Sequence, residues 1–225
     1  MNNLLQLIFS IVLLTILFFI SQISIRQLFR LFHAFVKSNN IVYILISVLL
    51  LPGTIIHELS HAFMAMILQL RIVDIHIFPK WKHGQIKLGS VLYEKKDVFR
   101  SILVGVAPFF FGFIILWWLY GIGMYQSTSI IQHIGISYIV FVISTTMFSS
   151  KQDIVDIIYM IPVVIIIIGI VYIFRIDMEV LSRLIELEGV ANFLYSIRTY
   201  LTITIGIHIA IIIFSTSILA LHTKL

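Results

Sequence analysis

Residues 51–70 read LPGTIIHELSHAFMAMILQL and place a His-Glu-x-x-His signature inside an apolar run. On a helix, positions i and i+4 lie one above the other on the same face, so His57 and His61 point in the same direction. This spacing suits two imidazoles that bind one metal ion. Glu58 lies about 100° around the helix, near enough to reach a water on that ion. The stretch therefore predicts a membrane helix that carries a metal site.

The composition indicates a membrane protein. Hydrophobic residues make up 60% of the 225-residue chain and charged residues only 11%, whereas ordinary globular chains carry roughly 25% charged residues. Apolar runs of membrane-spanning length recur from end to end. We predict one all-α, polytopic membrane domain over residues 1–225. The net charge of +5 comes from basic residues between the apolar runs, which is typical of cytoplasmic loops and does not indicate nucleic-acid binding.

About six apolar segments are predicted to span the bilayer: 4–25, 41–70, 98–124, 134–149, 155–174 and 199–221. The amphipathic stretch 26–40 is expected to lie along the interface, and 177–195 is expected to form a charged helix before the last span. Pro52 and Gly53 are expected to kink the second segment. Basic residues crowd both 26–40 and 71–100, which a single spanning helix would place on opposite sides. The orientation therefore stays open.

A polar insert follows the signature helix at residues 71–97. The sequences DIHIF (74–78) and QIKLGSV (85–91) alternate by twos around KHG (82–84), which predicts a short, membrane-associated β-hairpin. Two roles are open for it. The hairpin either presents a strand edge to an extended peptide, or it is an interfacial loop that anchors through Trp81, Tyr93 and its lysines.

The signature needs a further metal ligand. The chain has no cysteine, so thiolate sites are excluded and the ligands must be histidine and carboxylate. Two histidines leave a zinc site one ligand short. Asp153 and Asp156 are candidates because apolar segments flank them. The alternative is a pair of buried histidines with hydrogen bonds to their neighbours and a neutralised Glu58, although ionisable groups inside a membrane usually have a function.

Three motifs, in order, resemble those of site-2 proteases, the zinc metalloproteases that cut within membranes. They are HELSH (57–61), GVAPFFFG (105–112) and TTMFSSKQD (145–153). The third aligns with the family's Asn-x-x-Pro-x-x-x-x-Asp-Gly motif, and the resemblance covers about 41–160. The chain departs from that motif at three positions: Thr145 stands for Asn, Phe148 for Pro and Ile154 for Gly.

The resemblance implies a zinc peptidase in a multi-pass protein of the bacterial cytoplasmic membrane. His57, His61 and Asp153 would bind Zn²⁺, so the motif selects Asp153 over the other carboxylate. Glu58 would act as general base and then as general acid.

The resemblance also implies a substrate site. Thr145 or Thr146 would offer a hydroxyl in place of the family's Asn. The strand edge around Gly89, Ser90 and Val91 would pair with the substrate. The substrate would be a membrane-spanning or membrane-proximal peptide that reaches the site from the lipid bilayer.

Two other classes of function remain open. One is a non-catalytic metal-binding protein of the same fold, such as a sensor or an immunity factor. The other is a metal transporter, which would also carry His and Asp within the membrane. A glutamate beside two ligands that is not itself a ligand argues against transport.

Overall fold

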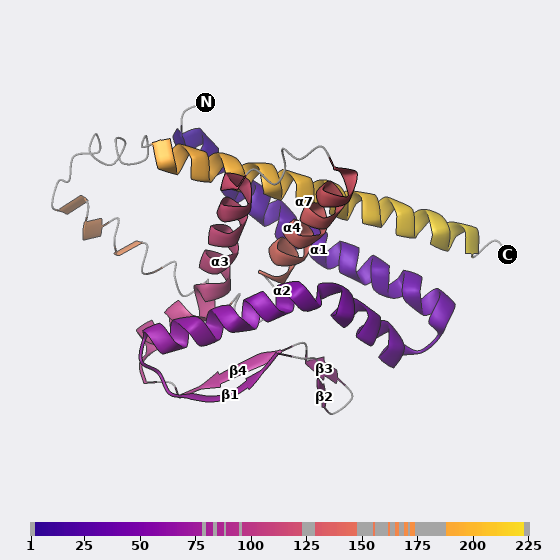
Figure 1. The fold of residues 1–225 in the computed structure, drawn as a ribbon, viewed down its shortest axis with the longest axis horizontal. Coiled ribbons are helices and arrows are strands. Elements are labelled where there is room, and N and C mark those ends of the chain that lie inside the picture. Colours follow the sequence, from indigo (N-terminus) through magenta and orange to yellow (C-terminus); the bar gives the residue numbers. More distant parts are fainter. Residues whose placement is uncertain are drawn as a thin grey trace.

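The computed structural model describes residues 3–77, 80–82, 85–87, 89–94, 96–122, 129–147 and 188–222, with eight helical positions between 155 and 173. These residues form five helices and four short strands (Figure 1). Four of the helices are long and apolar enough to cross a membrane: α1 (Asn3–Val36), α2 (Asn39–Ile67), α3 (Val98–Gly121) and α7 (Glu188–His222). The helix α4 (Ile130–Thr146) is shorter, at 17 residues. A helical membrane protein is thus confirmed, but six spans are not, because 155–174 lies largely outside the described residues.

The outer faces of the long helices are apolar. Phe19 of α1 is 61% exposed, Val48 of α2 is 60% exposed and Ile213 of α7 is 61% exposed. Large side chains of this kind are costly in water and favourable in hydrocarbon. The exposed surface therefore matches a protein that is surrounded by lipid.

The first apolar segment and the stretch 26–40 do not separate into a span and an interfacial helix. They form one 34-residue helix, α1. No Gly or Pro interrupts it, and hydroxyls inside it donate to backbone carbonyls of the preceding turn, as Ser10 does to Gln6 at 2.8 Å. The helix ends where Lys37 adopts a φ of 53°. The pattern of charges predicts where the chain meets the membrane interface. It does not predict where the helix ends, because the end is set by the left-handed conformation of Lys37.

The helices α1 and α7 lie side by side and run in the same direction (Figure 1). Near their middles, Leu17 and Leu201 share one buried cluster. Near their ends, the rings of Phe35 and His222 are 5.7 Å apart. The expected charged helix 177–195 is not a separate element over its described part, because residues 188–195 are the first turns of α7.

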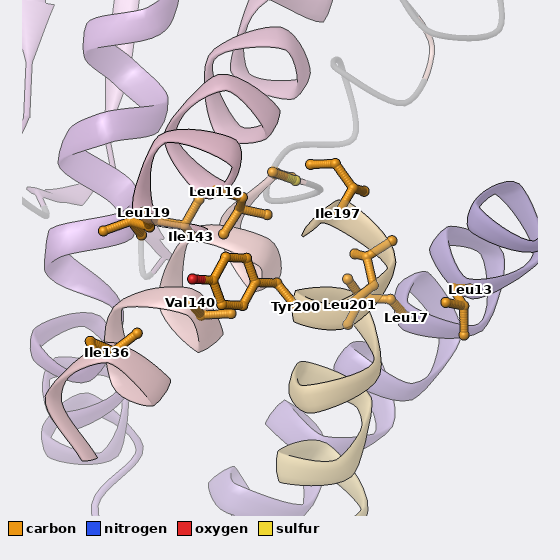
Figure 2. Close-up of a cluster of buried hydrophobic side chains, with 11 residues drawn as sticks. Leu13, Leu17, Leu116, Leu119, Ile136, Val140, Ile143, Ile197, Tyr200 and Leu201 are labelled. Atoms are coloured by element: carbon orange, nitrogen blue, oxygen red, sulfur yellow. The ribbon is translucent and has the colours of Figure 1, made fainter. Parts of the chain in front are cut away.

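The largest buried cluster joins α1, α3, α4 and α7. Tyr200 is fully buried and lies among Leu116, Val140 and Leu201 (Figure 2). A second cluster packs Val42, Ile46 and Leu50 of α2 against Phe141 and Val142 of α4. The short α4 is therefore held between α2 and the other helices, which places the end of α4 against the signature helix.

The predicted hairpin is confirmed. Strand β1 (Ile72–His76) pairs antiparallel with β4 (Ser90–Tyr93), and β2 (Lys80–Lys82) pairs antiparallel with β3 (Gln85–Lys87). The hairpin folds back along α2 (Figure 1). Tyr93 is half-buried and packs against a buried cluster that contains Ala65 and Val104. The side chain of Trp81 lies outside the described residues.

Candidate metal centre

The two signature histidines meet on one face of α2. The Nε2 atoms of His57 and His61 are 3.2 Å apart. Two nitrogens bound to one tetrahedral zinc at 2.0–2.1 Å are separated by about 3.3–3.4 Å. His57 is 3% exposed, and His61 is half-buried. The two nitrogens are thus within hydrogen-bonding distance of each other, and their separation is also close to the one that a shared zinc ion requires.

A backbone carbonyl orients His61. The Nδ1 of His61 lies 2.8 Å from the carbonyl oxygen of Val104 on α3. Because a carbonyl can only accept, Nδ1 carries the hydrogen, and in a neutral ring Nε2 then carries the lone pair. A metal-binding histidine commonly donates its other ring N–H in this way, which fixes its orientation.

The third ligand cannot be placed. Asp153 and Asp156 lie outside the described residues, and within the described ranges no group of three or more potential ligands comes together. The described donors fit zinc as two imidazole nitrogens, and a complete site would need a further ligand. The assignment of Asp153 stays a prediction.

The hairpin reaches the signature carboxylate. Glu58 is 7% exposed, and a methyl group built on Gly89 would lie 2.5 Å from its Cγ and 2.6 Å from its Oε1. Gly89 directly precedes β4, where Ser90 pairs with His76. Gly89, one of the residues expected to bind substrate, is therefore beside Glu58, and with Glu58 in its present position only a residue without a side chain fits there.

The two threonines at the end of α4 have different surroundings. Thr145 is buried; its hydroxyl donates to the carbonyl of Phe141 at 2.6 Å and lies 3.2 Å from Nε2 of His208 on α7. The hydroxyl of Thr146 donates to the carbonyl of Val142 at 2.8 Å. Thr145 thus joins α4 to α7, and Thr146 is the threonine that lies on the side of the signature helix.

A small cavity of about 10 Å³ lies beside His57. Its lining comes from α2, α3 and the end of α4: Gly53, Ile56, His57, Pro108, Gly112, Ile143, Thr146 and Met147. Both glycines permit close contact. A methyl group on Gly53 would lie 2.4 Å from a backbone oxygen of α4, and one on Gly112 would lie 2.1 Å from Met147. The three motifs found in the sequence therefore meet at this cavity.

One residue of the site, Val104, was not found by sequence reasoning. The Val104 carbonyl is a backbone group, so no residue type marks it. The available signal was Pro108, four residues later, which removes the amide that would otherwise donate to that carbonyl.

Comparison of the chain with protein-family models, curated proteins and solved structures gives no match.

Proposed function

We propose that this chain is an intramembrane zinc metalloprotease of the site-2 type, which hydrolyses peptide bonds in or near the bilayer. One observation carries the proposal. Two histidine Nε2 atoms lie 3.2 Å apart next to a glutamate that is 7% exposed. Three ionisable groups in an apolar helix are costly unless they serve a function.

The metal would be held by His57 and His61, with Asp153 as the third ligand. When bound, zinc supplies a Lewis acid and a water whose pKa is lowered to about 7. The hydrogen bond from His61 to Val104 directs the Nε2 lone pair of His61 towards His57. The imidazole of His61 is therefore already oriented before a metal ion binds.

Proton transfer is assigned to Glu58. This carboxylate would take a proton from the attacking water and return it to the leaving amine. Burial shields Glu58 from bulk solvent, and the contact with Gly89 limits its rotamers. The contribution expected from a positioned general base is roughly 10²–10⁴-fold in rate.

The substrate would bind as an extended strand at the hairpin. A helical peptide hides its carbonyls in hydrogen bonds, whereas a sheet edge holds a strand open through its main chain. Thr146 fits as an acceptor at this site, because its hydrogen is already donated to Val142. The substrate is then a membrane-spanning or membrane-proximal peptide, in what we propose is a bacterial cytoplasmic membrane.

The test is purified protein in proteoliposomes with a membrane-anchored reporter peptide. We expect about one zinc per chain, and we expect Glu58→Gln to retain that zinc while cleavage falls by roughly 10²–10⁴-fold. His57→Gln and His61→Gln should lose zinc. Glu94→Gln is the matched control, because Glu94 is an exposed carboxylate that follows β4.

Several results would contradict the proposal. Wild-type protein that binds no zinc would exclude the metal site. Stoichiometric zinc without cleavage of any anchored peptide would favour the non-catalytic class. Zinc flux through the vesicles would favour a transporter.

A further inference from the structure

A proline lies inside α3 at position 108 and is buried. In an uninterrupted helix the amide of residue 108 would donate to the carbonyl of Val104. Proline has no amide hydrogen, so this bond is excluded by covalent structure. The carbonyl that loses its helical donor is the same one that accepts from Nδ1 of His61 at 2.8 Å.

The Val104 carbonyl needs a donor. Val104 is 1% exposed, and a buried carbonyl without a partner costs about 1–3 kcal/mol. His61 comes from a different helix and meets this need. If residue 108 had an amide hydrogen, that amide and the imidazole would share this carbonyl, and the bond to His61 would be weakened.

We propose that Pro108 is a positioning residue, which leaves the Val104 carbonyl free to hold His61 with its hydrogen on Nδ1 and its lone pair on Nε2. The consequence for zinc rests on the proposed function. The choice of ring nitrogen does not rest on it, because the hydrogen bond is made without metal. The hydrogen bond that one ring nitrogen of a histidine makes determines which of the two nitrogens carries the hydrogen.

A second proline in the chain provides the control. Pro52 lies inside α2 and likewise removes the amide that would donate to residue 48. Val48 is 60% exposed on the outer face of α2. Pro52→Ala therefore adds an amide hydrogen to an apolar helix without competing for the acceptor of His61.

The experiment measures the hydrogen position directly. Metal-free protein labelled with ¹⁵N-histidine is studied in micelles at alkaline pH, where imidazole is neutral. The signal of His61 is assigned by its loss in His61→Gln. We expect the Nδ1–H form in wild type and in Pro52→Ala, and a shift towards the Nε2–H form in Pro108→Ala. Zinc affinity, measured by competition with a chelator, should fall about 10–100-fold in Pro108→Ala alone.

Lactic acid at position 108 separates the missing amide from the shape of the proline ring. It places an ester oxygen where alanine has N–H, so it cannot donate to Val104. This variant should keep both the Nδ1–H form and the zinc affinity of wild type, even if Pro108→Ala does not fold. Loss of either in the lactic acid variant would overturn the proposal, as would an unchanged hydrogen position in Pro108→Ala.

The outcome is distinguishable from failure of the proposed function. Protein that binds no zinc but shows the expected change of hydrogen position would refute the protease and leave the role of Pro108 intact. Equal zinc affinity in wild type, Pro52→Ala and Pro108→Ala, with the Nδ1–H form kept in all three, would refute only the role of Pro108.

Discussion

The contact between the hairpin and the signature carboxylate predicts the effect of Gly89→Ala. The added Cβ would lie 2.5 Å from Cγ, 2.6 Å from Oε1 and 2.7 Å from Cδ of Glu58. All three atoms belong to a flexible side chain, so Glu58 can move away without a shift of the backbone. We expect the fold to survive and the carboxylate to leave its position.

The size of the displacement follows from these distances. Ordinary van der Waals contact begins at 3.4 Å, so Oε1 must move by 3.4 − 2.6, or about 0.8 Å. A misplacement of about 1 Å at a reacting group costs roughly 10²-fold in rate. Under the proposed function, Gly89→Ala should therefore lower kcat for cleavage of an anchored peptide by about 10²-fold while the zinc content stays at the wild-type level.

The control is Gly206→Ala, because a methyl group on Gly206 meets nothing within 4 Å. In a helix this change should be neutral or stabilising by up to about 1 kcal/mol, with unchanged cleavage. Wild-type kcat in Gly89→Ala would refute the argument that Glu58 needs this position. A matching loss of zinc and thermal stability would instead show that the hairpin is a structural support.

The close contacts of α4 lead to further predictions. Gly53→Ala places a methyl group against a backbone carbonyl of α4 and should cost about 1–3 kcal/mol by overpacking, seen as a lower Tm; Gly112→Ala meets only a flexible methionine end and should cost less, so equal losses would contradict this reasoning. Thr145→Val leaves a buried imidazole donor without its acceptor and should lower stability by about 1 kcal/mol, whereas Thr146→Val should lower peptidase activity more than stability; the reverse pattern would exchange their roles. Because α1 and α7 run in the same direction, reporters fused to the two chain ends should lie on opposite sides of the membrane, and reporters on the same side would exclude this arrangement.

The parts of the site that depend on local spacing could be predicted from the sequence. Helical geometry alone brings His57 and His61 to one face, and alternation around KHG predicts the antiparallel pairing of the strands. The proximity of Gly89 to Glu58 could not be derived in this way. It depends on how far the hairpin folds back along α2, and no sequence period reports that distance.

Other features could not be predicted because they depend on the backbone, or because the sequence pattern reports a different property. The length of α1 depends on the absence of Gly and Pro up to Lys37, whereas the amphipathic pattern of 26–40 reports only the preference for an interface. Motif alignment placed Thr145 at the position of the family's Asn, but the neighbouring Thr146 lines the cavity beside His57. Thr145 instead bonds to His208, because successive helical positions point about 100° apart.

The hairpin has a physical consequence for substrate binding under the proposed function. Each sheet has two strands within the described residues, so every strand there has one edge without a strand partner. Backbone groups that lack partners at membrane depth cost several kcal/mol each. Glu58 lies ten residues before the C-cap of α2 at Leu68, or about 15 Å along the helix, and Gly89 lies beside it. Under the proposed function, an extended peptide that pairs with such an edge would satisfy these groups, so the main-chain bonds that hold the substrate open would also favour its binding.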